Sequence, residues 1–156
     1  MIDSTSTSVS SHRAASAGYA ADVDTAEDVG KLLLRVGLGL LILLHGIAKI
    51  SNGPAGVLGM VAQTGLPAAL GYLVYVGEVV APLLLIAGVW TRAAAAVIAV
   101  NMVVAVLLVH GGEFFTLSKT GGWALELQGL YFAAAVAVAL LGAGRFSLGG
   151  SAGRLN

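Results

Sequence analysis

The stretch from Lys31 to Ile50, KLLLRVGLGLLILLHGIAKI, constrains the fold more than any other part of the chain. It is long enough for a membrane-spanning helix, which needs about 20 mostly apolar residues. Yet it contains Arg35, His45 and Lys49, and their heptad spacing places these side chains on one stripe of a helix. The pattern predicts a helix that faces lipid on one side and a polar partner within the protein on the other.

The composition agrees with a membrane protein. Hydrophobic residues make up 58% of the chain and charged residues only 10%, whereas about a quarter of the residues in a typical soluble domain are charged. The formal net charge is zero, so bulk charge gives no reason to expect nucleic acid as a partner. The sequence contains no cysteine, which excludes disulfides, thiol relays, cysteine-ligated iron–sulfur clusters and a cysteine nucleophile. Any electron chemistry therefore requires a cofactor or a lipid-soluble carrier.

The chain divides into three predicted parts. Residues 1–29 are rich in Ser, Thr and Ala and lack the basic and apolar regions of a signal peptide, so we predict a flexible cytoplasmic tail. Thr25 and Asp28 fit a capping box, which predicts that the first helix begins near residue 26. Residues 30–149 form the predicted four-helix transmembrane domain, and residues 150–156 form a second cytoplasmic tail.

Breaker residues separate the predicted helices. Four apolar segments are long enough to span a bilayer, at about residues 26–50, 68–89, 93–110 and 123–142. Pro54 opens a helix of about ten residues that is too short to span, so we expect it at the membrane interface. Only helices and closed barrels satisfy backbone groups in lipid, and short connections make neighbouring helices antiparallel. The sequence therefore predicts an all-α integral membrane protein, an up-down four-helix transmembrane bundle with one short interfacial helix between the first two spans.

The basic residues predict the orientation of this bundle. One side holds Arg13, Lys31, Arg35, Arg92, Arg145 and Arg154, and the other holds Lys49 and Lys119. Cytoplasmic segments carry an excess of Lys and Arg. The uneven distribution therefore predicts that both termini lie in the cytoplasm.

Five ionisable residues fall at a similar depth in the outer half of the predicted bundle: His45, Lys49, Glu78, His110 and Glu126. A charge inside a membrane costs several kcal/mol unless it is paired. We therefore expect an ion pair of Lys49 with Glu78 or Glu126, with a histidine nearby. Such pairs either fix the register of the helices or line a functional pocket, and their number at one depth favours the pocket. Arg35 lies at the inner end, where its side chain can extend to the interface.

Further residues extend this predicted pocket. Pro82 cannot donate a hydrogen bond to the carbonyl of Glu78, four residues before it, so we expect a kink and a free backbone acceptor beside the carboxylate. Tyr75 lies near Glu78 on the same side of that helix, although aromatic residues are equally common at membrane interfaces. The candidate cofactor-binding residues are Tyr75, Asn101 and His110, and the candidate catalytic residues are His45, Lys49, Glu78 and Glu126.

Two metal-based alternatives have less support. His45 and His110 lie near the outer ends of their helices and could ligate a haem, but no other motif supports haem. The donors His45, Glu78, His110 and Glu126 are chemically suitable for a metal ion, yet the sequence shows no metal-binding motif. We therefore expect neither haem nor a metal site.

Short motifs between residues 30 and 149 carry a family resemblance. In chain order they are His45-Gly46-Ile47-Ala48-Lys49, Gly65-Leu66-Pro67, Glu78, Gly88-Val89-Trp90-Thr91-Arg92, Trp123-Ala124-Leu125-Glu126 and Gly142-Ala143-Gly144-Arg145-Phe146-Ser147-Leu148. Their order and spacing resemble the DoxX family. The resemblance implies a small four-helix protein of the bacterial or archaeal inner membrane. It also implies a link to quinone redox work, as in subunits of thiosulfate:quinone oxidoreductase, quinone or catechol detoxification, or the tethering of soluble redox proteins. It supplies no catalytic residues to transfer.

Three functions remain open from the sequence. The first is an oxidoreductase subunit that binds a quinone ring near His45 and Lys49, with protons relayed by Glu78 or Glu126. The second is a scaffold that recruits a soluble redox enzyme through loop 111–122 or the tails. The third is a proton-coupled carrier of a small solute, which with four helices requires a homo-oligomer. The expected partners are the lipid bilayer, a soluble or membrane redox protein, and a second copy of the chain.

Overall fold

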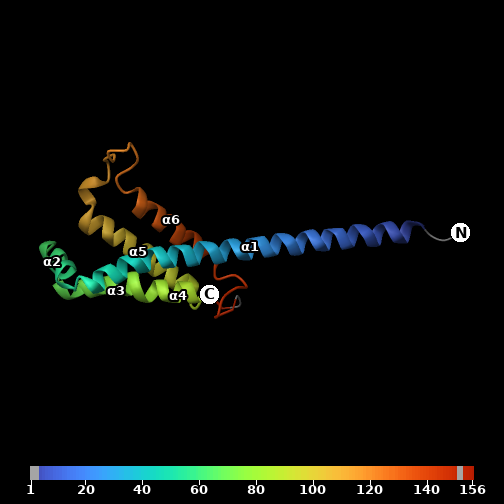
Figure 1. Ribbon diagram of the computed structural model, residues 1–156, viewed down its shortest axis with the longest axis horizontal. Helices are drawn as coiled ribbons and strands as arrows, with labels where there is room; N and C mark the ends of the chain where they lie inside the picture. The colour runs from blue at the N-terminus through green and yellow to red at the C-terminus, as the bar shows by residue number, and fades with distance from the viewer. Residues whose placement is uncertain (1–3, 151–152) are drawn as a thin grey trace.

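The computed structural model describes residues 4–150 and 153–156, with side chains from residue 23 onward. The helices are α1 (Ser4–Ser51), α2 (Ala55–Gln63), α3 (Leu73–Tyr75), α4 (Ala81–Ala87), α5 (Thr91–Val109) and α6 (Glu126–Leu141). Irregular helical turns complete them, a 3₁₀ helix at Ala68–Tyr72, a π turn at Val76–Val80 and a second 3₁₀ helix at Gly111–Glu113. Figure 1 shows that the other helices pack along the C-terminal half of α1.

Three helical segments are long and apolar enough to cross a membrane. They are residues 23–51 of α1, the continuous helical stretch 68–87 that contains α3 and α4, and α5. Helix α6 has only 16 residues and is shorter than a typical span. These segments agree with the predicted all-α membrane class.

The helices share one apolar core. Helix α1 contacts α4 and α6, and α5 contacts the same two helices from the other side. The core residues are Leu38, Ile42, Ala81, Leu85, Ala94, Ala95, Ile98, Ala99, Met102, Ala135 and Val138. Leu33, Leu44, Leu107 and Leu140 remain exposed on the outside. An apolar exterior around an apolar core is typical of helices that lie in lipid.

Helix α1 begins at Ser4, so the predicted start near residue 26 is wrong. Thr25 and Asp28 do not cap a helix. Instead, Thr25 Oγ1 and Asp28 Oδ1 each accept a hydrogen bond of 3.1 Å from Arg145, whose guanidinium also pairs with Asp28 at 2.7 Å. Five alanines among residues 14–21 favour continuation of the helix toward the N-terminus. The flexibility and the cytoplasmic place of residues 1–29 stay predictions.

The second span is less regular than the single helix predicted over residues 68–89. Its helical structure ends at Ala87, and Gly88 follows with a left-handed φ of 70°. The distortion expected at Pro82 takes the form of a π turn, in which the N–H of Ala81 bonds to the carbonyl of Val76. Because Pro82 has no N–H, the backbone just before it cannot complete the α-helical pattern. The π turn accommodates this loss, as such turns often do at functional positions.

Arg35 is buried, so the expectation that its side chain extends to the interface is wrong. The residue is 1% exposed. Its Nη1 donates hydrogen bonds to the carbonyls of Leu85 at 2.8 Å and Ile86 at 2.6 Å, and its Nη2 donates to the carbonyl of Phe146. The carbonyls at the end of α4 form the negative end of a helix dipole. Arg35 therefore joins α1 to α4 and to the segment after α6.

We expect Arg35→Lys to lower the free energy of unfolding by about 1.5–3 kcal/mol, the effect of one hydrogen bond to a charged group. A single ammonium cannot reproduce the planar fork that reaches carbonyls on two segments. SDS titration in mixed micelles measures this change. The matched control is Arg154→Lys at an exposed position, and equal stabilities of the two variants would contradict the role assigned to Arg35.

Candidate functional site

Lys49 of α1 and Glu78 of the π turn form an ion pair, with Nζ 2.5 Å from Oε2. The Glu78 side chain is 7% exposed and the Lys49 side chain 33% exposed. A charged pair is the form in which ionisable groups persist inside a membrane. The sequence predicts an ion pair of Lys49 with either Glu78 or Glu126, and in the structure the partner is Glu78.

Two glycines fix the position of Glu78. A Cβ added to Gly46 would lie 2.3 Å from the carbonyl oxygen of Glu78, the acceptor that Pro82 leaves without its α-helical donor. On the other side of the π turn, a Cβ added to Gly77 would lie 2.6 Å from Cγ of Asn101 on α5. The π turn is therefore held at close range between α1 and α5, with the carboxylate beside Lys49.

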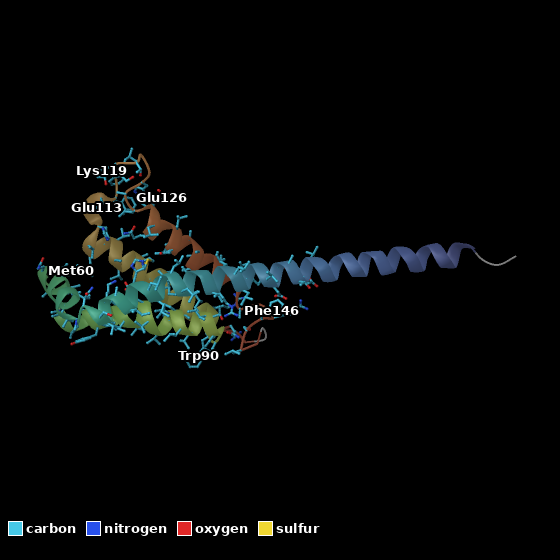
Figure 2. The ribbon with its side chains drawn as sticks, in the orientation of Figure 1. Met60, Trp90, Glu113, Lys119, Glu126 and Phe146 are labelled. Atoms are coloured by element: carbon cyan, nitrogen blue, oxygen red, sulfur yellow. The ribbon has the colours of Figure 1, made fainter. Side chains whose placement is uncertain are left out.

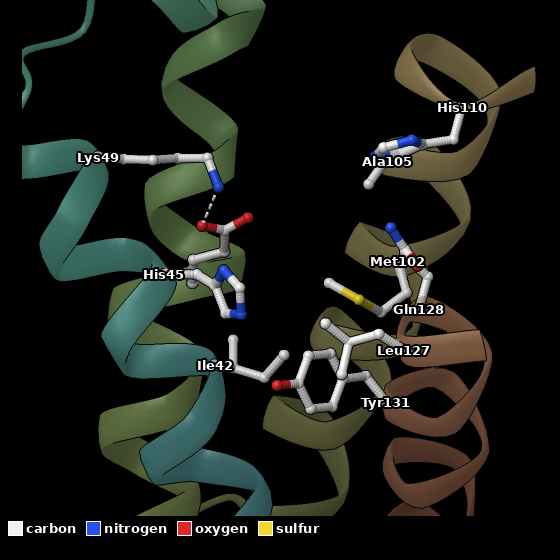
Figure 3. A pocket seen from close by; sticks show the side chains of 10 residues that line it. Ile42, His45, Lys49, Met102, Ala105, His110, Leu127, Gln128 and Tyr131 are labelled. Carbon is white, nitrogen blue, oxygen red and sulfur yellow. Dashed lines mark hydrogen bonds and ion pairs between the residues drawn. The ribbon is translucent and has the colours of Figure 1, made fainter. Parts of the chain in front are cut away.

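The ion pair borders a cavity of about 220 Å³, drawn in Figure 3. Its lining comes from α1, the π turn, α5 with the residue that follows it, and α6. The lining residues are Ile42, His45, Lys49, Glu78, Met102, Ala105, His110, Leu127, Gln128 and Tyr131. Because His45 and Leu127 are exposed, the cavity opens between α1 and α6.

Polar and apolar groups lie on different parts of the wall. His45 and Lys49 point into the cavity from α1, opposite Tyr131 on α6 (Figure 3), and Glu78 of the π turn, the partner of Lys49, also lines it. The rings of His45 and Tyr131 meet edge to face with their centroids 6.0 Å apart. Ile42 closes one end with an apolar surface. The arrangement suits a small flat molecule with a hydrogen-bond acceptor.

His110 connects the cavity to the following loop. It comes directly after α5 and lines the cavity. Its Nδ1 lies 3.0 Å from Oε2 of Glu113, an exposed residue of the loop. His110 and Glu113 therefore form a polar connection from the cavity to the exposed loop.

Three predicted site residues do not line the cavity. Glu126 is the first residue of α6 and is exposed, whereas a helix from residue 123 would place it one turn inside. The hydroxyl of Tyr75 donates to the backbone carbonyl of Lys49 at 3.3 Å. Asn101 packs against Gly77, and its Nδ2 is buried without a hydrogen-bond partner among the described residues. The predicted pocket therefore keeps His45, Lys49, Glu78 and His110 and lacks Glu126, Tyr75 and Asn101.

Two polar residues of the cavity, Gln128 and Tyr131, are not among the site residues predicted from the sequence. They are three residues apart, so they lie on one face of α6. The rest of that helix is almost entirely apolar. This spacing is the signal that could have identified the face of α6 that points to the other polar groups.

The proposed metal-ligand set is not assembled in the described part of the chain. No group of three or more His, Asp or Glu side chains there lies close enough to hold a metal ion. Glu126, one of the four expected donors, does not line the cavity with the other three. In the described part of the chain, these four residues therefore do not come together as one ligand set.

The model of the DoxX family matches residues 30–111, more than half of the 156-residue chain. The chain belongs to the DoxX family. The match covers the cavity residues of α1, the π turn and α5, together with His110. It ends before α6, so the motifs at residues 123–126 and 142–148 lie outside it. As a DoxX protein with apolar helices of spanning length, the chain is an integral membrane protein in contact with the lipid bilayer.

Two curated relatives of this DoxX protein add limited information. An uncharacterized protein of Haemophilus influenzae is 35% identical over 105 residues, which cover 64% of this chain and 77% of the relative. A Bacillus subtilis protein named "Putative oxidoreductase CatD" is 29% identical over 82 residues, which cover 53% of this chain and 60% of that protein. No solved structure matches the chain.

Proposed function

We propose that this DoxX protein is a subunit of a quinone-linked membrane oxidoreductase and that its cavity binds the quinone ring. The observation that carries the proposal is the Lys49–Glu78 pair at the wall of the cavity, next to His45. A pair needed only for helix register does not require an open space beside it. Paired ionisable groups that face an interior space are typical of functional sites in membrane proteins. The name of the CatD relative supports the same class of function.

The residues fit a quinone ring. The ring is flat and apolar, and its carbonyl oxygens accept hydrogen bonds, which His45 and Lys49 can donate. Ile42 and Met102 supply apolar walls. The cavity of about 220 Å³ is smaller than the roughly 300–1,000 Å³ of sites for drug-sized ligands, so it suits one substituted ring better than a porphyrin. The opening between α1 and α6 gives an apolar tail a path into the lipid.

When bound, a quinone supplies a site that takes up electrons and protons together. In the proposed mechanism, Lys49 Nζ and a His45 ring nitrogen hold a carbonyl oxygen by hydrogen bonds. The Lys49 ammonium would donate a proton toward that oxygen, and the Glu78 carboxylate paired with it would accept a proton in turn, as a general acid–base group requires. His110 and Glu113 pass protons between the cavity and the exposed loop. Because the chain has no cysteine, electrons come from a soluble or membrane redox partner.

We also propose the placement of the chain in the membrane. Helix α6 is the fourth span of an up-down bundle, because it packs along α5 and contacts α1. Helix α2 lies at the interface. The excess of basic residues on the N-terminal side supports cytoplasmic termini in the inner membrane of a bacterial or archaeal cell.

We expect Glu78→Gln to weaken the binding of a short-chain benzoquinone or naphthoquinone at least tenfold, about 1.4 kcal/mol, as measured by equilibrium titration of the purified protein. The amide cannot pair with Lys49 or hold the proton. Glu27→Gln is the matched control, because Glu27 is exposed and its ion pair is with the nearby Lys31, away from the cavity. Unchanged binding in Glu78→Gln would exclude the quinone role of this cavity. The better hypothesis would then be that the protein is a scaffold for a soluble redox enzyme. In that case, replacing loop 111–122 should release the soluble partner.

A further inference from the structure

The loop between α5 and α6 exposes large apolar side chains that the proposed quinone site does not use. We name residues 111–125 the aromatic loop. Phe115 is 93% exposed and Leu117 73% exposed, and Phe114 and Trp123 are also exposed. Soluble surfaces rarely carry such a concentrated apolar patch unless something covers it.

The aromatic loop holds these side chains in a fixed arrangement. The Phe114 ring meets the rings of Phe115 and Trp123 edge to face, with centroids 5.0 Å and 5.6 Å apart. The indole Nε1 of Trp123 donates a 2.7 Å hydrogen bond to the carbonyl of Phe114, and Leu117 forms a β-bridge with Trp123. The outward position of Phe115 and Leu117 is therefore a property of an ordered loop.

The direction of the aromatic loop shows what faces it. Figure 1 shows the loop projecting sideways from the axis of α1, while α2 lies at the end of α1. Helix α1 carries a membrane span, so its axis gives the approximate direction across the bilayer. A loop that extends sideways from this axis enters the space occupied by lipid, rather than the water beyond the end of the bundle.

The length of α6 leads to the same conclusion. Its 16 residues extend about 24 Å at 1.5 Å per residue, which is less than the hydrocarbon thickness of about 30 Å. The aromatic loop begins where α6 is still short of the far side of the hydrocarbon layer. Phe114, Phe115 and Leu117 suit that depth, and Trp123 is a residue type enriched at membrane interfaces.

We propose that the aromatic loop inserts Phe114, Phe115 and Leu117 into the lipid leaflet next to it and so completes the short span of α6. Figure 2 shows Glu113, Lys119 and Glu126 around the loop, and in this proposal their charged side chains extend toward the lipid headgroups. The occupant of this apolar surface is therefore lipid. The inference does not depend on the quinone proposal.

Site-directed spin labelling tests the inference on the full chain, because the chain has no cysteine to remove. A nitroxide is attached to Phe115→Cys or Leu117→Cys, and the protein is reconstituted in phospholipid vesicles. We expect oxygen to relax both labels efficiently and a water-soluble nickel chelate to reach them at least fivefold less than a label at Asp24→Cys, which is exposed on α1. Equal nickel access at residues 115 and 24 would overturn the inference and favour a protein partner for this surface.

A second measurement guards against an effect of the label itself. In a Trp90→Phe background, Trp123 is the remaining tryptophan, and we expect lipids brominated on their acyl chains to quench its fluorescence. Phe115→Ser/Leu117→Ser should at least halve this quenching, because both side chains are exposed and their loss leaves the contacts between Trp123 and Phe114 in place. Quenching that is absent in the parent, or unchanged in the double variant, would contradict insertion.

Discussion

Replacing Gly46 by alanine is expected to lower the free energy of unfolding by about 3 kcal/mol, the upper end of the usual cost of overpacking. The added methyl group would lie 2.3 Å from the carbonyl oxygen of Glu78 and 2.7 Å from a side-chain carbon of Val79. The first of these is a backbone atom, which cannot rotate away. Helix α1 must then move away from the π turn, and Lys49 and Glu78 must separate. We therefore also expect quinone binding to fall at least tenfold.

Gly37→Ala is the matched control, because it makes the same change in the same helix. Nothing in the described part of the chain lies within 4 Å of a Cβ at this position. Alanine is the better helix former, so we expect no loss of stability and a gain of up to about 1 kcal/mol. SDS titration in mixed micelles gives both values. Similar stabilities for the two variants would show that close contact with the π turn does not hold the site in place.

Removing one member of the Lys49–Glu78 pair is expected to lower the free energy of unfolding by about as much as Gly46→Ala does. Glu78→Leu leaves the Lys49 ammonium without its partner near the middle of the structure. Breaking a fully buried pair costs about 3–5 kcal/mol. Because the Lys49 side chain is 33% exposed, we expect a loss of about 3 kcal/mol, the lower end of this range.

The double variant Lys49→Met/Glu78→Leu separates stability from function. Both charges are then absent, and apolar side chains of similar volume replace them, which is often neutral or stabilising for buried pairs. We expect the double variant to regain most of the lost stability and still fail to bind quinone. A double variant as unstable as Glu78→Leu alone would mean that the free ammonium is not the cause of the loss.

Much of the site follows from the sequence because an apolar helix tolerates few polar residues. His45 and Lys49 are four residues apart on α1 and therefore share one face. The lengths of the predicted spans place Glu78 and His110 at a depth in the membrane similar to that of His45 and Lys49. The structure places all four around one cavity. The missing N–H of Pro82 likewise predicts a distorted helix beside Glu78, and the structure has the π turn there.

The remaining features depend on contacts between distant segments, which no local pattern contains. Thr25 and Asp28 bind Arg145, more than a hundred residues away, instead of capping a helix. The burial of Arg35 depends on carbonyls at the ends of two other segments. Glu126 was misplaced because α6 begins only three residues later than predicted, which moves this residue to the exposed end.

Photolabelling with an azido-quinone is the most direct test of the central claim, that the cavity beside Lys49 and Glu78 binds a quinone. The purified full-length protein is irradiated in vesicles with the probe, with and without an excess of unlabelled quinone, and the labelled peptides are identified by mass spectrometry. The account predicts labelling near His45 and Lys49 on α1 and near Tyr131 on α6, suppressed by the competitor. Labelling confined to other segments, or unaffected by the competitor, would contradict it.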